Sequence, residues 1–147
     1  MLTNSVNALV IGASGAIGQA LVRKFLDDSH IEQVFAVSRS DANIDHPKLR
    51  WLTTDYNESS MQTVVNELSE HKGTFSKVCI CHGILHGEHI FPEKRMEEIT
   101  VDMMQSIFYA NTIAPSLWLK LLRKILAGSV ECKVACFSAR VGSTGDN

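Results

Sequence analysis

Short apolar runs alternate with stretches of helical periodicity along the chain, and this alternation limits the possible folds more than any other feature. The runs have the length and character of buried strands, and they cover residues 8–11, 34–37, 49–52, 78–81 and 133–137. Apolar residues three or four positions apart, which form one face of a helix, recur at 17–26, 61–68 and 101–126. Strands that alternate with helices form a parallel sheet with right-handed crossovers.

The alternation predicts one α/β domain over residues 1–147, built on a doubly wound parallel sheet of about five strands. In sheets of this kind, ligands bind beyond the carboxyl ends of the strands. Four unusual segments follow expected strands at that edge, at residues 12–18, 38–39, 55–56 and 81–83. We therefore expect the functional site to be assembled from these segments.

The composition excludes several classes of function. The chain has 147 residues, a formal net charge of -2 and 45% hydrophobic residues, so nothing indicates a nucleic-acid partner or an acidic membrane surface. No apolar run approaches the roughly 20 residues that span a bilayer, and the polar start of the chain does not resemble a signal peptide. Cys79, Cys81, Cys132 and Cys136 form no Cys-x-x-Cys pair. We expect them to be buried free thiols in a reducing cytoplasm.

The segment from Gly12 to Gly18 lies between the first expected strand and the first expected helix. Glycines at such a turn let the backbone approach a pyrophosphate closely, and the N–H groups at the start of the helix attract its negative charge. Ser14 adds a hydroxyl group. A glycine motif alone is weak evidence, but a strand before it and a helix after it favour a phosphate site over a plain glycine-rich turn.

The spacing of the glycines distinguishes two kinds of nucleotide-binding loop. The common dinucleotide fingerprint needs a glycine at its third position, which is Ser14 here. The loop instead resembles the Gly-x-x-x-Gly-x-Gly pattern of the short-chain dehydrogenases/reductases. In that register Gly12, Ile17 and Gly18 match the pattern, and Ala16 replaces its middle glycine.

The resemblance to this family covers nearly the whole chain, and the sequence at 81–85 and 140–147 looks closest to the C-factor-like members of the family. It implies a Rossmann-like sheet with strand order 3-2-1-4-5 that lacks the family's later strands. It also implies that Asp55 bonds the adenine ring, and that Cys81-His82-Gly83 replaces the family's Asn-Ala-Gly as an altered adenine-ribose wall. The residues expected to bind the cofactor are Gly12, Ser14, Gly15, Ala16, Ile17, Gly18, Ser38, Arg39, Asp55, Tyr56, Cys81, His82 and Gly83.

The residues after the second expected strand indicate which nicotinamide cofactor is used. An acidic residue there would accept a hydrogen bond from the ribose 2′-hydroxyl of NAD, but the sequence has Ser38-Arg39-Ser40. Arg39 can bind a 2′-phosphate through two parallel hydrogen bonds, so we expect NADP rather than NAD. The alternative is that Arg39 is a solvated loop cation beside Asp41.

Pro115 interrupts the long helix expected at 101–126. Proline has no N–H group, so the carbonyl of Asn111, four residues earlier, loses its helical partner and the helix kinks there. The resemblance implies that the carbonyl of this asparagine holds a water molecule in a proton relay. The alternative is a polar residue at a proline kink, without a chemical role.

The catalytic groups that the resemblance implies are only partly present. The family reduces carbonyls with a serine, a tyrosine and a lysine, and the last two lie four residues apart on the helix after the fifth strand. The chain has no Tyr-x-x-x-Lys and ends at Asn147 before such a helix. In the family's Ser-Ser-x-x-Gly pattern, Ala139 stands at the catalytic serine, which leaves Ser138 and Ser143 as candidates beside Asn111.

We therefore expect an NADP-dependent short-chain oxidoreductase fold, which would transfer hydride between the nicotinamide and a carbonyl or alcohol substrate but is inactive as this truncated chain. The alternative is a non-catalytic nucleotide-binding or interaction protein derived from such an enzyme. A methyltransferase-like domain is disfavoured, because the loop has no Gly-x-Gly turn.

Two further expectations concern partners and metals. Without a sixth strand, the fifth strand is an exposed edge, and the 101–126 helix is apolar on more than one face, so we expect a homo-oligomer through that edge or helix. The residues that widen this apolar surface are Leu117, Trp118, Leu121, Leu122, Ile125 and Leu126. The loop after the fourth strand contains His82, His86, Glu88 and His89. We expect no metal site there, because all four side chains belong to one flexible loop and no other segment would fix their positions.

Overall fold

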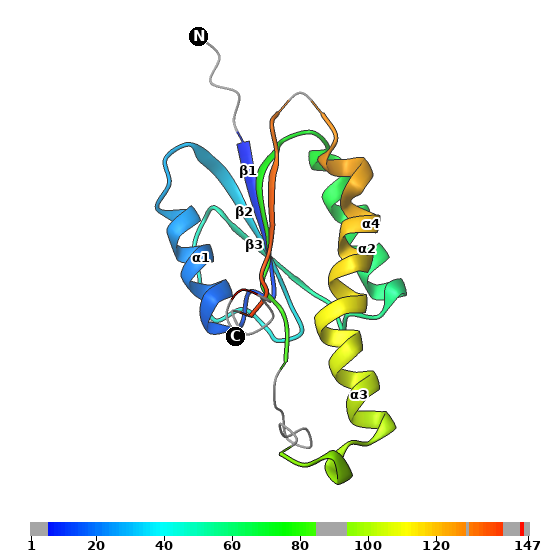
Figure 1. Cartoon of the computed structure of the whole chain (residues 1–147). Helices are drawn as coiled ribbons and strands as arrows, with labels where there is room; N and C mark the ends of the chain where they lie inside the picture. Colours follow the sequence, from blue (N-terminus) through cyan, green and yellow to red (C-terminus); the bar gives the residue numbers. More distant parts are fainter. Residues whose placement is uncertain (1–5, 85–93, 129, 140–144, 146–147) are drawn as a thin grey trace.

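The structure, a computed structural model, describes residues 6–84, 94–128, 130–139 and 145. Its strands form one parallel sheet in the order β3-β2-β1-β4-β5, between layers of helices (Figure 1). The strands are β1 (Val6–Ile11), β2 (Ile31–Ser38), β3 (Leu49–Thr53), β4 (Phe75–Ile80) and β5 (Lys133–Cys136). The Rossmann-like α/β fold and the strand order expected from the sequence are confirmed.

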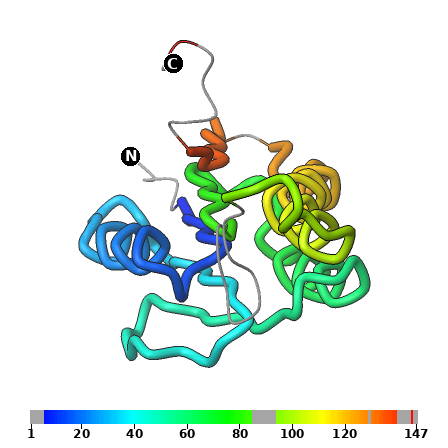
Figure 2. The backbone as a smooth tube through the Cα atoms, turned by 60° about the horizontal axis from the view of Figure 1, so that its bottom comes forward, coloured from blue at the N-terminus to red at the C-terminus, as the bar shows by residue number. Residues whose placement is uncertain are grey.

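The helices lie on both sides of the sheet. They are α1 (Ala16–Leu26), α2 (Glu58–Leu68), α3 (Val101–Phe108) and α4 (Ala114–Leu126), with short 3-10 turns at Ser69–His71 (η1) and Met96–Glu98 (η2) and a π-helical turn at Tyr109–Ile113 (η3). Figure 2 shows the layers from one end of the molecule, with α1 on one side of the sheet and α2 and α4 together on the other. The sheet is therefore the middle layer of three.

Successive residues of β1 belong to two different cores. Leu9 and Ile11 join the larger cluster, which includes residues of α2 and α4, whereas Ala8 and Val10 join the smaller cluster with α1. Side chains of a strand alternate between the two faces of its sheet, so one apolar run contributes to both cores. Trp118, from α4, is fully buried in the larger one. The central strand is thus covered on both faces.

The buried face of α1 differs from the one expected from the sequence. Val22, Phe25 and Leu26 are buried, but Ile17 is 54% exposed. A crossover helix runs back from the carboxyl end of its strand, and Ile17 lies in the first turn, at the rim of the sheet. The periodicity predicted the buried face correctly for the later turns of α1. It was wrong only for Ile17 in the first turn, which does not pack against the sheet.

The helix expected at 101–126 is irregular in its middle. α3 passes into the π-helical turn, where the N–H of Ala114 donates to the carbonyl of Tyr109, and Pro115 lies in the first turn of α4. The irregularity predicted near Asn111 therefore takes the form of a π turn. Such turns are rare, and they often lie at functional sites.

The apolar surface of this helix is not where the sequence placed it. Leu117, Leu121 and Leu126 of α4 pack against the larger core and are partly buried, so α4 has less free apolar surface than expected. Apart from Leu119 of α4, the exposed apolar side chains lie earlier, on α3 and the π turn. They are Val101, Met104, Phe108 and Ile113.

The edge strand β5 is exposed along its whole length. It pairs only with β4 among the described strands, and all four of its residues are solvent-exposed. Cys136 is exposed, and Cys81 and Cys132 are only half-buried, which corrects the expectation that all four thiols are buried. All four cysteines are free. Within the described part of the chain, no helix is both long and apolar enough to cross a membrane.

Candidate nucleotide-binding site

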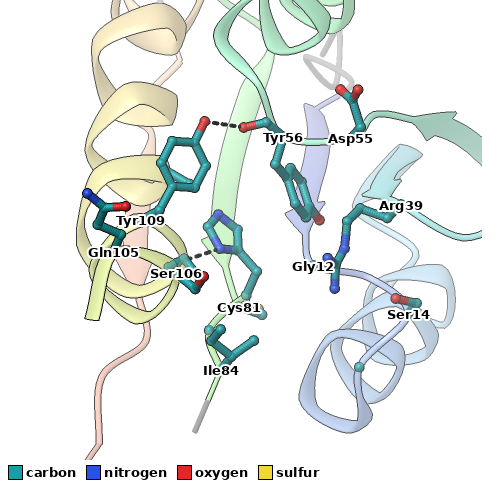
Figure 3. A pocket seen from close by; sticks show the side chains of 15 residues that line it. Gly12, Ser14, Arg39, Asp55, Tyr56, Cys81, Ile84, Gln105, Ser106 and Tyr109 are labelled. Atoms are coloured by element: carbon teal, nitrogen blue, oxygen red, sulfur yellow. Dashed lines mark hydrogen bonds between the residues drawn. The ribbon is translucent and has the colours of Figure 1, made fainter. Parts of the chain in front are cut away.

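A cleft of about 660 Å³ lies beyond the carboxyl ends of the first four strands (Figure 3). Its volume is within the range of small-molecule and cofactor sites. Each of the four segments singled out in the sequence contributes to its wall, and the α3–π–α4 helix forms another side. The lining residues are Gly12, Ser14 and Gly15 after β1, Arg39 after β2, Asp55 and Tyr56 after β3, Cys81 to Ile84 after β4, and Gln105, Ser106, Tyr109, Ala110 and Ala114 of the helix.

The turn after β1 needs glycine at two positions. Gly12 has φ of +81°, and a Cβ placed on it would lie 2.6 Å from the backbone nitrogen of His82. A Cβ on Gly18 would lie 2.2 Å from the carbonyl oxygen of Gly12. No side chain can therefore replace either hydrogen without moving backbone. These contacts pack the start of α1 against the turn and bring the turn close to the loop after β4.

The start of α1 is suited to bind an anion. Gly15 is the N-cap residue, and no side chain caps the helix. The first N–H groups of a helix lack partners within it and carry the positive end of its dipole. Ser14 and Gly15 line the cleft, whereas Ala16 and Ile17 are exposed residues of the first turn outside its wall and Gly18 is buried in the packing. Of the six loop residues expected to bind the cofactor, Gly12, Ser14 and Gly15 therefore line the cleft, and the other three do not.

Arg39 lines the cleft without a carboxylate partner in the described part of the chain. Asp41, considered as its partner from the sequence, forms no ion pair with it there. The guanidinium carbon lies 6.0 Å from the centre of the Tyr56 ring. Ser38 is fully buried, and its Oγ accepts a hydrogen bond from Ser40 N–H at 3.2 Å. Ser38 therefore shapes the turn that carries Arg39, outside the cleft wall.

Asp55 lines the cleft next to the start of α2, and its carboxylate is already hydrogen-bonded. Asn57 Nδ2 donates to both carboxylate oxygens at 2.8 Å, and the hydroxyl of Ser60 donates to one of them. The hydrogen bond from Ser60 is the main cause that lowers the pKa of Asp55. The group is ionised at neutral pH and remains an acceptor, because a carboxylate has about four lone-pair positions.

Tyr56 and His82 stack on each other inside the cleft, with ring centres 4.8 Å apart and planes at 27°. Burial raises the pKa of Tyr56 to about 12, and burial lowers the pKa of His82, so both rings are neutral at pH 7. His82 Nδ1 lies 3.2 Å from the carbonyl oxygen of Ala110. Because a carbonyl only accepts, Nδ1 carries the proton. Nε2 is then an acceptor, and it is buried without a partner among the described residues.

Asn111 contributes its side chain to the loop after β4. Its Oδ1 accepts from Ile84 N–H at 2.7 Å, and its Nδ2 donates to the Ile84 carbonyl at 2.7 Å. A Cβ on Gly83 would lie 3.0 Å from Oδ1 of Asn111. Asn111 therefore joins the π turn to this loop, although it does not line the cleft. The role expected for its backbone carbonyl stays a prediction.

The helix wall of the cleft was missed by the sequence analysis, apart from its neighbour Asn111. Gln105 and Tyr109 lie four residues apart, and so do Ser106, Ala110 and Ala114. Figure 3 shows Tyr109 reaching toward Tyr56, and its hydroxyl donates to the Tyr56 carbonyl at 2.7 Å. The spacing of four was a usable signal, because it marks one face of the helix.

The remaining candidates do not join the cleft. Ser138 and Ala139 are exposed beyond the end of β5 and are absent from the cleft wall. Ser143 lies outside the described residues, as do His86, Glu88 and His89. Across the described ranges, no group of three or more histidine, cysteine, aspartate or glutamate side chains could hold a metal ion.

Comparison with known proteins finds relatives only at the level of structure. No family model and no curated protein matches the sequence. Among solved structures, the chain is similar to a short chain dehydrogenase family protein from Francisella tularensis, with TM-score 0.75 and 17% identity over 97% of this chain and 57% of that one. It is also similar to an NADPH-bound carbonyl reductase from chicken fatty liver, with TM-score 0.81 and 22% identity over 97% and 63%.

A third similar structure is a carbonyl reductase from Pseudomonas aeruginosa, with TM-score 0.77 and 24% identity over 95% of this chain and 64% of that one. The chain therefore spans between 57% and 64% of the length of these three proteins. Identities below 25% over so much of the chain carry information on the fold alone. They show that this chain adopts the α/β fold of the short-chain dehydrogenase/reductase proteins.

Proposed function

We propose that the chain is the NADP-binding portion of a short-chain oxidoreductase, which transfers hydride between a nicotinamide and a carbonyl or alcohol carbon. The observation that carries the proposal is the cleft at the strand ends, which joins a helix N-terminus without a side-chain cap to an arginine without a carboxylate partner in the described residues. No acidic side chain from the segment between β2 and β3 lines this cleft. The likeness to an NADPH-bound carbonyl reductase supports the same proposal.

The residues present fit a dinucleotide. Gly12 lines the cleft and has no side chain, so its backbone can approach a pyrophosphate. Ser14, Gly15 and the first turn of α1 would bind the phosphates, and Arg39 would bind the 2′-phosphate. Asp55 would accept a hydrogen bond from the adenine amino group. The nicotinamide would supply or accept the hydride.

We propose further that this chain binds the cofactor without turning over a substrate. Reduction of a carbonyl needs a group that delivers a proton to its oxygen. Neither tyrosine of the sequence has a lysine four residues later. The hydroxyl of Tyr109 donates to the Tyr56 carbonyl, and the Tyr56 hydroxyl lies 3.5 Å from the Val37 carbonyl. A non-catalytic nucleotide-binding protein is the second candidate, and it rests on the same observation.

The test of cofactor binding compares NADPH and NADH in fluorescence titrations of the wild type, Arg39→Ala and Arg50→Ala. Arg50 is a suitable control, because it pairs with Glu67 at 3.5 Å and lies outside the cleft. Loss of charge-assisted hydrogen bonds should weaken NADPH binding by about tenfold or more in Arg39→Ala. NADH binding, and both affinities of Arg50→Ala, should stay at the wild-type values. An unchanged NADPH preference in Arg39→Ala would exclude Arg39 from the site.

A turnover assay separates binding from catalysis. The purified chain is mixed with NADPH and a panel of aldehydes and ketones, and absorbance at the nicotinamide band is followed. We expect binding without consumption of NADPH. Consumption that depends on the substrate would refute both the inactivity of this chain and the non-catalytic candidate. The absence of any dinucleotide binding would refute the proposed function itself.

We also propose that the chain self-associates through α3 or the β5 edge. Phe108 is 55% exposed and Val101 is 69% exposed on α3, and the strand residue Val134 is 43% exposed. Val101 and Phe108 line one mainly apolar groove with Met104 and Ile113, and apolar surface of this kind marks an interaction site. Light scattering after size exclusion should show an oligomer that Phe108→Glu or Val134→Glu dissociates.

The four cysteines are free thiols, which agrees with a reducing compartment. We therefore propose that the protein is cytoplasmic.

A further inference from the structure

Tyr56 has the most unusual backbone conformation in the described residues. Its φ is +62°, and no other residue except glycine in those ranges has positive φ. For a bulky side chain this region is an energetically unfavourable outlier. Such residues persist only where the surrounding structure holds them, and they concentrate at ligand sites. Tyr56 lies in the wall of the cleft.

Contacts on several sides fix Tyr56. Its backbone N–H donates to Thr54 Oγ1 at 3.3 Å, and its carbonyl accepts from the Tyr109 hydroxyl at 2.7 Å. The ring stacks on His82 at 4.8 Å and meets Trp118 edge-on at 6.2 Å. Because the backbone and the ring are both held, the side chain is a rigid part of the wall.

The ring of Tyr56 extends from the end of β3 to the end of β2. Its hydroxyl lies 3.5 Å from the carbonyl of Val37, two residues before Arg39. Figure 3 shows Arg39 and Tyr56 directed into the same space from neighbouring strand ends. The guanidinium carbon of Arg39 lies 6.0 Å from the ring centre, where the negative face of the ring attracts a cation. No described carboxylate competes for Arg39.

We infer that Tyr56 is a positioning residue for cofactor choice, because its fixed ring holds the Arg39 guanidinium at the end of β2 for the 2′-phosphate. The inference rests on the proposed function. An exposed arginine otherwise loses rotamer freedom when it binds, and a contact that orders the side chain beforehand reduces this loss. The benefit applies only to a ligand that Arg39 binds, so it affects NADP and leaves NAD unaffected.

The test is the ratio of NADPH to NADH affinity in variants at position 56. Removal of an exposed cation–π contact changes an affinity by about two- to fivefold. Tyr56→Leu and Tyr56→Asn remove the ring and should lower the ratio by this factor. Tyr56→Phe keeps the ring and should retain the wild-type ratio. In an Arg39→Ala background, Tyr56→Leu should change the ratio no further, because the partner of the ring is already absent.

Two different substitutions at position 56 distinguish the loss of the ring from a general loss of folded structure. Leucine can keep an apolar contact with Trp118, but it disfavours the positive φ of position 56. Asparagine tolerates positive φ but loses the contact with Trp118. Both affinities are measured on the same sample, so an unfolded fraction cancels in their ratio. A purely structural role of Tyr56 would lower both affinities and leave the ratio unchanged.

The outcomes separate this inference from the proposed function. A wild type that prefers NADPH, with an unchanged ratio in Tyr56→Leu and Tyr56→Asn, overturns the role of Tyr56 and leaves the proposed function in place. A ratio that rises in these variants also overturns it, because the ring would then hold Arg39 away from the phosphate. A wild type that binds neither dinucleotide overturns the proposed function, and the inference falls with it.

Discussion

β1 and β5 are both short strands with apolar centres, yet their surroundings are opposite. Five of the six residues of β1 are buried, and all four residues of β5 are exposed. β1 pairs with β2 and β4 and lies between two helical layers, whereas β5 pairs only with β4 among the described strands. The difference shows that coverage by other elements, and not the sequence of a strand, decides how much of it is buried.

The loops after β1 to β4 and the residues after β5 differ in the same way. The loops after β1 to β4 meet in a cleft, and each forms a hydrogen bond with another segment. The residues after β5 that the family resemblance singled out, Ser138 and Ala139, have no place in it. Both residues are exposed. We therefore regard the cleft as the supported part of the site.

The largest expected effect comes from removing the cover of β1. Trp118 is fully buried above the strand, in the cluster that contains Leu9 and Ile11. Trp118→Ala should lower the free energy of unfolding by about 3–5 kcal/mol, because it removes a large buried ring and leaves a cavity. Urea denaturation followed by circular dichroism measures the loss. Leu119→Ala, at a neighbouring residue that is 43% exposed, is the control and should cost about 0.5 kcal/mol or less.

A substitution within β1 should have the next largest effect. Val10 is fully buried on the α1 side. Val10→Ala removes two methyl groups, each worth about 0.8 kcal/mol, and a cavity cost adds to them, so we expect a loss of about 2 kcal/mol. The urea midpoint gives the value. A loss below about 0.5 kcal/mol would mean that α1 does not cover the strand tightly.

The loop after β4 should make stability depend on pH. Burial lowers the pKa of His82 from the ordinary value of 6.5, so the unfolded chain binds more protons than the folded one below that pH. The free energy of unfolding should therefore fall as the pH drops below about 6.5, down to the lowered folded pKa. Urea midpoints from pH 7.5 to 5.5 test this.

Removal of the His82 imidazole tests whether this residue causes the pH dependence. His82→Gln should reduce the fall in stability between these pH values, because it removes the group that gains a proton on unfolding. An equal slope in the wild type and His82→Gln would contradict the burial of a neutral imidazole in the cleft.

The smallest effect is expected at the exposed strand. Val134→Ala in β5 is the same substitution as Val10→Ala, at a residue that is 43% exposed. We expect the free energy of unfolding of the monomer to change by about 0.5 kcal/mol or less. The measurement is made at low protein concentration, and repeated at high concentration. A cost near that of Val10→Ala at both concentrations would show that β5 is covered within one chain.

Much of the fold could be predicted from local pattern. The apolar runs located all five strands, and the glycine spacing located the turn after β1. The errors share one cause, which is that periodicity describes an element and not its neighbours. Ile17 has the correct spacing but lies at the rim of the sheet, and Cys136 lies in an apolar run that no described element covers.

The site shows the same division. The sequence located Arg39, Asp55 and the loop after β4, because the residues after parallel strands converge at one edge. It did not reveal that Tyr109 bonds the Tyr56 carbonyl, or that Asn111 holds the Ile84 backbone through its side chain. These contacts join segments that lie 27 to 53 positions apart. Their geometry depends on how the helix packs against the sheet.

The sequence by itself determined the alternation of strands and helices, the glycine turn and the absence of an acidic residue at Ser38-Arg39-Ser40, because these depend on a few neighbouring residues. Only the tertiary structure decided that β1 is covered and β5 is not, and that the ring of Tyr56 reaches Arg39 from another strand. The physical reason is that burial and side-chain contact arise between surfaces distant in sequence, and packing selects which of those surfaces meet.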